Sequence, residues 1–274
     1  MKCAWQDLIR ILLPWLGTAV DSHKDTLQEI RLRLGQPTEL ILHKGSVWLQ
    51  REASAEDLNF CVNTASRYSP WAAQTVAQGF ITAPGGHRIG ICGDAVIQSE
   101  VMTGIRQMNS LNIRVARDFL GIGAAAANLK GSVLILGPPG SGKTTLLRDL
   151  IRRIAETETV SVVDERGELF PAGFQRGKRM DVLIGCPKAI GIEIMLKTMG
   201  PDCIAVDEIT SEADCSALFH SAWCGVRLLA TAHATSVDDL RQRPVYRPLL
   251  ESKLFSNALI LSRDKSWRYE RMDL

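Results

Sequence analysis

The stretch LILGPPGSGKTTLLRDL, residues 134–150, decides the fold class of this 274-residue chain. Its centre, GPPGSGKT at residues 137–144, matches the phosphate-binding loop pattern, in which two glycines frame four residues and are followed by Lys and then Ser or Thr. An apolar, strand-like run leads into the loop and a helix-like run leads out of it, which is the context that the pattern requires. The stretch therefore predicts a nucleotide-binding loop between a buried strand and a helix.

Each part of this loop has an expected role in binding a nucleotide. The glycines allow successive backbone N–H groups and the N-terminus of the helix to face a phosphate. Lys143 is expected to reach the terminal phosphates, and the Thr144 hydroxyl is expected to bind Mg²⁺. The alternative, a glycine-rich turn without a chemical role, does not explain why motif, strand and helix agree. The predicted nucleotide-binding residues are Gly137, Pro138, Pro139, Gly140, Ser141, Gly142, Lys143, Thr144 and Thr145.

A second run, CIAVDEI at residues 203–209, is a strand-like segment that ends in two carboxylates. The carboxyl ends of parallel strands meet at one edge of a sheet, where a phosphate loop also lies. We expect Asp207 to hold Mg²⁺ through a water and Glu208 to orient or deprotonate the attacking water. A strand that ends in surface acids is the alternative, and the phosphate loop in the same chain favours the site.

Two further strand-like runs end in side chains that suit the same site. VSVVDERGEL, residues 160–169, makes Glu165 a candidate to support the metal or its waters and Asp164 a candidate for an ion pair with Arg166. LLATAHATS, residues 228–236, leads to His233, where a residue that senses the γ-phosphate would be useful. For both runs the alternative is an ordinary strand end, because such positions often carry charged or hydrogen-bonded side chains.

Composition limits the classes of protein that the chain can belong to. Hydrophobic residues make up 46% of it, which is ordinary for one large domain or two smaller ones. The 32 basic and 30 acidic residues are too balanced to indicate a nucleic-acid-binding protein. The seven cysteines form no CxxC pair, which argues against a structural zinc site and fits a reducing cytoplasm. Arg10 and Pro14 interrupt the apolar run at residues 8–20, so we expect an amphipathic helix there and not a membrane span.

Hydrophobic periodicity predicts two domains joined by a linker. The larger one, residues 131–274, alternates apolar strand-like runs with helix-like segments, which is typical of a parallel sheet with helices on both faces. Residues 117–130 contain an alanine run and predict a helical linker. Residues 1–116 predict an α+β domain with these elements: a helix at 5–19, strands at 29–35 and 39–50 with a turn at 45–46, helices from 54 and from 70 to 78, and short strands after 79 with turns at 84–86 and 93–94.

The four strand ends, in this order, resemble the motor ATPases of type II and type IV secretion. Those proteins carry a phosphate loop, an acidic box, a Walker B strand and a histidine box, and the matching positions here are Lys143, Glu165, Glu208 and His233. Within that superfamily the chain resembles the stage III sporulation protein AA family, through GFITAPGGHRIGICGDAV, SLNIRVAR, GPPGSGKTTLLRDL, VVDERGEL, DVLIGCPKA, PDCIAVDEI and ATAHATS. The pattern departs from that family in QRGKRMDVL, which contains Arg179 and Asp181, and in KAIGIEIM.

The resemblance implies an α/β fold, with a RecA-like P-loop core preceded by the smaller α+β domain. It implies a Mg²⁺-dependent ATPase with ATP as substrate and catalytic roles for Lys143, Glu165, Glu208 and His233. Such a motor would be cytoplasmic in the mother cell of an endospore-forming bacterium. It would lie at the periphery of a membrane secretion or channel complex, built from proteins of the same sporulation operon, which it energises or assembles.

The resemblance also implies a homo-oligomer, a hexameric ring in which an arginine of the N-terminal strands completes a site. Arg106 and Arg114 are the first candidates for that arginine, and Arg88 is the third. Two alternatives of other classes are a nucleic-acid-dependent P-loop ATPase and a non-catalytic, nucleotide-bound scaffold. The balanced charge argues against nucleic acid as a partner, and the intact loop and carboxylates argue against the scaffold.

Overall fold

The computed structural model describes residues 3–66, 79–171 and 173–272. The chain divides into two compact units. The N-terminal unit comprises Met1–Asp118 and Pro171–Phe174, and the C-terminal unit comprises Phe119–Phe170 and Gln175–Leu274. The helix expected over residues 70–78 lies outside the described residues. Within the described part of the chain, no helix combines the length and the apolar character needed to cross a bilayer.

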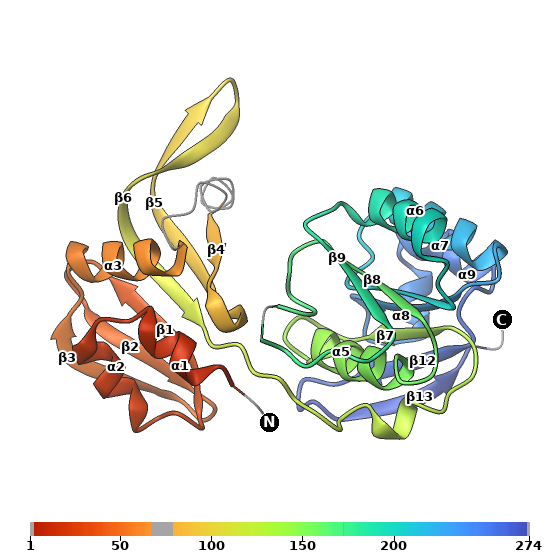
Figure 1. Ribbon diagram of the computed structural model, residues 1–274, viewed down its shortest axis with the longest axis horizontal. Coiled ribbons are helices and arrows are strands. Elements are labelled where there is room, and N and C mark those ends of the chain that lie inside the picture. The colour runs from red at the N-terminus through yellow and green to blue at the C-terminus, as the bar shows by residue number, and fades with distance from the viewer. Residues whose placement is uncertain (1–2, 67–78, 172, 273–274) are drawn as a thin grey trace. The chain divides into compact units, whose positions relative to one another are not determined.

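The N-terminal unit is built on one antiparallel sheet of six strands in the order β3-β2-β1-β6-β5-β4 (Figure 1). The inward side chains of this sheet and of its helices form a single hydrophobic core, which explains why the strands alternate apolar and polar residues. The elements of this unit are α1 (Trp5–Arg10), α2 (Pro14–Asp21), β1 (Leu27–Arg33), β2 (Pro37–Leu42), β3 (Ser46–Glu52), α3 (Ala55–Ser66), β4 (Phe80–Thr82), a 3₁₀ turn (Pro84–Gly86), β5 (Arg88–Gln98) and β6 (Val101–Arg114).

The first helices differ from the expectation in a way that one proline explains. The expected helix over residues 5–19 is wrong as a single element, because the structure divides it into α1 and α2. Leu13 is extended and Pro14 lies in the first turn of α2. Proline disfavours helical backbone at the residue before it and fits the first turn of a helix. A capping box begins α3, since the Ser54 hydroxyl accepts the Asp57 N–H and the Asp57 carboxylate accepts the Ser54 N–H.

The ribbon formed by β5 and β6 corrects a second expectation, the turn at residues 93–94. The two strands run past that position and turn at Ser99 and Glu100, whose φ angles are 48° and 65°. Positive φ at both central residues is the geometry of a two-residue hairpin turn. At Gly93 the register shifts, and a Cβ atom there would lie 2.6 Å from the Gln107 carbonyl oxygen. Glycine at position 93 therefore permits a bulge inside the ribbon.

The C-terminal unit contains a seven-stranded sheet in the order β13-β12-β7-β11-β10-β8-β9. Its neighbouring strands run parallel, except that β13 runs antiparallel to β12. The elements of this unit are two 3₁₀ turns (Ala124–Ala126 and Pro244–Tyr246), β7 (Val133–Leu136), α5 (Lys143–Ile154), β8 (Val160–Asp164), β9 (Met180–Ile184), α6 (Lys188–Met199), β10 (Cys203–Val206), α7 (Glu212–Trp223), β11 (Arg227–Ala232), α8 (Val237–Arg241), α9 (Arg247–Glu251), β12 (Asn257–Leu261) and β13 (Trp267–Arg271).

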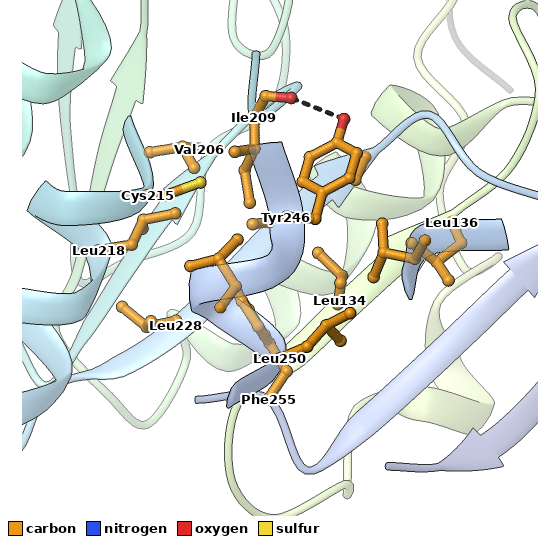
Figure 2. Packing of buried hydrophobic residues seen from close by; sticks show 14 of the residues in the cluster. Leu134, Leu136, Val206, Ile209, Cys215, Leu218, Leu228, Tyr246, Leu250 and Phe255 are labelled. Carbon is orange, nitrogen blue, oxygen red and sulfur yellow. Dashed lines mark hydrogen bonds between the residues drawn. The ribbon is translucent and has the colours of Figure 1, made fainter. Parts of the chain in front are cut away.

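Helices cover both faces of this sheet. Along β7, Leu134 and Leu136 pack in the hydrophobic cluster that contains α6, α7 and α9 residues, and Val133 and Ile135 pack in the cluster that contains α5. Figure 2 shows part of the first cluster, in which side chains from several strands and helices meet. Strands buried on both faces are apolar throughout, and this is the pattern that the sequence shows. The expected α/β class with a mostly parallel sheet is confirmed.

The segment before β7 is not the helix that its alanine run suggests. It contains the 3₁₀ turn Ala124–Ala126 between irregular residues. The Asp149 carboxylate on α5 accepts the N–H groups of Gly121 and Gly123 at 3.1 and 2.8 Å. A Cβ atom at position 123 would lie 3.1 Å from the Leu150 nitrogen, so glycine allows the segment to lie against α5.

His87 connects three parts of the N-terminal unit. Its side chain is fully buried, its Nδ1 accepts the Ala116 N–H at 3.1 Å, and its Nε2 lies 3.1 Å from the Ala4 carbonyl oxygen. Because Nδ1 accepts, the ring carries its hydrogen on Nε2 and donates it to Ala4. Burial lowers the pKa of His87, and Arg117 acts in the same direction, whereas Ala4 and Asp7 oppose the shift. The ring is therefore neutral where it connects these segments.

We expect the N-terminal unit to lose stability as the pH falls below the ordinary histidine pKa of about 6.5. In that range the unfolded chain binds a proton that the folded His87 does not, so the free energy of unfolding falls by at most about 1.4 kcal/mol per pH unit. His87→Gln should remove this dependence. The measurement is urea unfolding at pH 7.5 and 5.5, in which hydrogen exchange of peptides from residues 79–116 monitors the N-terminal unit. Equal losses in the variant and the unmodified protein would contradict the assignment.

Candidate functional site

The loop between β7 and α5 has the backbone geometry of a phosphate site. Gly140 and Gly142 have φ angles of 74° and 98°, which side chains other than glycine adopt with strain. A Cβ atom at Gly137 would lie 2.5 Å from the Ser141 Oγ. That Oγ is buried and has no hydrogen-bond partner among the described residues. An unpaired hydroxyl beside the free N–H groups of a helix N-terminus fits a ligand with acceptor oxygens.

Lys143 lies in the first turn of α5 with its side chain buried. Its Nζ donates to the carbonyl oxygens of Gly137 and Pro138 at 2.9 and 3.0 Å and lies 3.1 Å from Nδ1 of His233. These three contacts use all the hydrogens of an ammonium group. Burial lowers the pKa of Lys143, and the carboxylates of Asp207 and Glu208 raise it. The lysine therefore already lies among the acids that the sequence assigns to this site.

A chain of hydrogen bonds joins the loop to the ends of β10 and β11. The Thr144 hydroxyl donates to one Asp207 oxygen at 2.7 Å, and the Thr231 hydroxyl donates to the other, also at 2.7 Å. The backbone N–H of Glu208 donates to the Thr231 hydroxyl at 2.8 Å. Hydroxyl and carboxylate oxygens are the ligands that Mg²⁺ prefers, so Thr144 and Asp207 have the donor chemistry to hold that ion.

Glu208 has a strained backbone, with a φ of 50°. This left-handed conformation costs a residue with a side chain about 1–2 kcal/mol. The Glu208 carboxylate lies between two partners, with Oε1 at 3.1 Å from Nε2 of His233 and Oε2 at 3.5 Å from Nη1 of Arg166. Strain of this kind persists where the surroundings hold a residue in place, and it is common at functional sites.

His233 bridges Lys143 and Glu208 through its two ring nitrogens. A lysine ammonium can only donate, so Nδ1 accepts from Lys143. The ring hydrogen is then on Nε2 and points at the Glu208 carboxylate. Three of the four residues expected to be catalytic are therefore joined by direct contacts.

Asp164 and Arg166 do not form the ion pair for which the sequence made them candidates. Asp164 is buried, and its carboxylate accepts the backbone N–H groups of Glu168, Leu169 and Phe170 at 2.9–3.0 Å. Burial raises the pKa of Asp164, and the amides of Phe170 and Leu169 oppose that shift. Arg166 reaches Glu208 instead. The correction has a simple cause, because a buried carboxylate at a strand end satisfies its oxygens with the N–H groups of the turn that follows.

Glu165, the fourth expected catalytic residue, has a different partner from the other three. Its carboxylate pairs with Lys188 Nζ at the start of α6. Lys188 is buried and also lies 3.8 Å from Asp214, the residue whose carboxylate completes the capping box of α7. Glu165 is thus connected to the first turns of two helices.

Sequence reasoning missed three residues of this neighbourhood: Thr231, Arg166 as a partner of Glu208, and Lys188. The signal for Thr231 is present, because a threonine in the apolar run before His233 is fully buried and needs a hydrogen-bond partner. Lys188 gave no such signal, since its partner Glu165 lies 23 residues away in the chain.

The three arginines considered for a role between subunits lie on the ribbon of the N-terminal unit. The Arg88 guanidinium lies over the Phe80 ring at 4.1 Å from its centre. Arg106 is exposed opposite Asp94, and Arg114 is exposed next to Arg88 on the neighbouring strand. Arg179 donates to the Thr157 carbonyl oxygen, and Asp181 lies on β9.

Comparison with known proteins identifies the family and the fold. A family model described as sporulation stage III, protein AA, matches residues 7–268. Stage III sporulation protein AA of Bacillus subtilis (strain 168) is 37% identical over an alignment of 258 residues, and the match covers 87% of this chain and 83% of that protein.

Two solved structures are similar in fold. The ATPase DotB of Legionella pneumophila has a TM-score of 0.62 and 18% identity, and the match covers 93% of this chain and 79% of DotB. The pilus retraction motor PilT with bound ADP has a TM-score of 0.63 and 14% identity, with 89% and 76% covered. These likenesses confirm the RecA-like α/β fold expected from the sequence. The family model and the Bacillus relative together show that this chain belongs to the sporulation stage III protein AA family.

Proposed function

We propose that the protein is an ATP-hydrolysing motor that energises or assembles a membrane secretion or channel complex during endospore formation. One observation carries the proposal: direct contacts join Lys143 and Thr144 of the phosphate loop to Asp207, Glu208 and His233. Family membership supports the sporulation context, and the names of the two structural neighbours, an ATPase and a retraction motor, support the activity.

In this proposal the loop binds the phosphates of ATP through its backbone N–H groups and Lys143. Lys143 donates its three hydrogens to protein atoms, so a phosphate oxygen has to replace at least one of these acceptors. Thr144 and Asp207 would hold Mg²⁺, which supplies positive charge next to the phosphate oxygens. Their mutual hydrogen bond places both oxygens in one small region.

Glu208 is the group that we propose to orient the attacking water and accept its proton. Its carboxylate is part-exposed and therefore accessible to a water, and His233 and Arg166 hold its two oxygens. His233 contacts both Lys143 and Glu208, so a change in the partners of Lys143 reaches the base through one imidazole. Glu165 would support the metal or its waters after leaving Lys188.

We further propose that the motor is a hexameric ring in the cytoplasm of the mother cell, peripheral to membrane proteins of the same operon. A motor needs cations that reach the γ-phosphate when neighbouring domains close. An arginine in this role can raise the rate of hydrolysis by roughly 10³ to 10⁵. The exposure of Arg106 and Arg114 makes them available for this role, and Arg88 is the third candidate.

Replacing the loop lysine tests the phosphate site. Lys143→Ala should lower kcat/KM for ATP by at least about 100-fold, because one fixed donor next to the developing charge is removed. Phosphate release and binding of a fluorescent ATP analogue measure the two effects. Lys130→Ala, which changes an exposed lysine before β7, is the matched control and should behave like the unmodified protein. Unchanged hydrolysis in Lys143→Ala would show that the loop is not the active site.

Replacing the proposed base separates binding from hydrolysis. Glu208→Gln should retain ATP affinity and lose about 10²- to 10⁴-fold in kcat, because the amide still accepts a hydrogen bond from His233 but accepts no proton. Equilibrium binding and single-turnover hydrolysis give the two values. Glu193→Gln, an exposed carboxylate on α6, is the control. If Glu208→Gln turns over normally and Glu165→Gln does not, the role of base belongs to Glu165.

Mixing two inactive variants tests the ring. Lys143→Ala protein and a protein with both Arg106→Ala and Arg114→Ala should regain part of the ATPase activity when they co-assemble, because some sites then combine an intact loop with an intact arginine. Light scattering on a sizing column with ATP and Mg²⁺ establishes the assembly. Absence of rescue in mixed assemblies would exclude action between subunits, and a mass that stays monomeric would exclude the ring.

A further inference from the structure

Tyr246, at the end of the 3₁₀ turn Pro244–Tyr246, places a single hydroxyl between the two loops that carry Glu208 and His233. Its side chain is buried in the hydrophobic cluster shown in Figure 2. The hydroxyl donates to the Ile209 carbonyl oxygen at 3.0 Å. Burial raises the pKa of Tyr246, and the nearby backbone of His233 opposes that shift. The hydroxyl therefore fixes the carbonyl group of the residue that follows Glu208.

The contact matters because Ile209 directly follows the strained Glu208. The Ile209 N–H donates to the Thr231 carbonyl oxygen at 2.9 Å, and its carbonyl accepts from Tyr246. Both backbone polar groups of Ile209 are thus fixed, one by β11 and one by the tyrosine. Glu208 has a φ of 50°, and such a conformation persists only where its neighbours are held.

We propose that Tyr246 is a positioning residue, whose hydroxyl holds the Glu208 backbone in its strained conformation and keeps the Glu208 carboxylate in contact with the His233 ring. The inference rests on the proposed function, because it assigns Tyr246 to the same site. The aromatic ring of Tyr246 and its hydroxyl have separable roles. The ring fills space in the core beside Leu249 and Leu250, and phenylalanine would fill the same space.

Tyr246→Phe removes the hydroxyl alone and tests this role. We expect kcat to fall by about tenfold or more, since small misplacements of catalytic groups cost up to roughly 100-fold. The KM and the Kd for ATP should stay within about twofold, because the phosphate loop is untouched. Tyr269→Phe is the matched control: Tyr269 is exposed on β13, and its hydroxyl donates to Asn257. A lower melting temperature with an unchanged kcat would overturn the proposal.

A double-mutant cycle identifies the route of the effect. If Tyr246 acts through the contact of Glu208 with His233, Tyr246→Phe should cost much less in a His233→Ala background than in the unmodified protein. If the two substitutions lower kcat by factors that simply multiply, Tyr246 acts through packing and not through the contact of Glu208 with His233. Hydrogen exchange gives a readout that needs no hydrolysis: peptides covering residues 207–211 and 231–235 should exchange faster in Tyr246→Phe and not in Tyr269→Phe. Faster exchange in a protein that never hydrolyses ATP would support the positioning role of Tyr246 and reject the proposed function. Unchanged exchange would reject the positioning role.

Discussion

The hydrogen bond between the Thr144 hydroxyl and the Asp207 carboxylate is the interaction on which the site depends. Thr144 lies in the first turn of α5, which follows β7, and Asp207 directly follows β10, but β11 lies between these two strands in the sheet. The bond therefore crosses the edge of β11, and that strand supplies Thr231 to the second Asp207 oxygen. The strand order determines these contacts, because only at the carboxyl edge of parallel strands can three consecutive strand ends converge on one loop.

The charges around this bond are arranged so that a phosphate would compete with protein groups. Lys143 donates to two carbonyl oxygens of its own loop and to His233, and Arg166 reaches Glu208. Cations next to acids in a part-buried site hold each other in place, and a polyanionic ligand offers those cations stronger partners. Because His233 contacts Lys143 on one side and Glu208 on the other, any exchange of partners by Lys143 alters the surroundings of the base.

The sequence predicts the parts of this molecule that follow from a local pattern of residues. It does not predict contacts between residues that lie far apart in the chain. Strands β7, β8, β10 and β11 are predicted because burial on both faces requires continuous apolar runs, and the loop is predicted by its glycines. The sequence predicts a turn where the structure has a bulge at Gly93, since glycine marks both and only the register distinguishes them. Lys188 and Tyr246 were missed because their partners lie 23 and 37 residues away, which no local period encodes.

The strained backbone of Glu208 explains how two consecutive acids serve one loop. In a regular strand Asp207 and Glu208 would point to opposite faces of the sheet. The positive φ at Glu208 ends that alternation, so Asp207 contacts Thr144 while Glu208 contacts His233, which itself contacts the neighbouring Lys143. Glycine at position 208 would adopt this backbone without cost but would lack the carboxylate. The strain is thus the consequence of placing a second acid beside the first, and the hydrogen bonds around Ile209 are what make it tolerable.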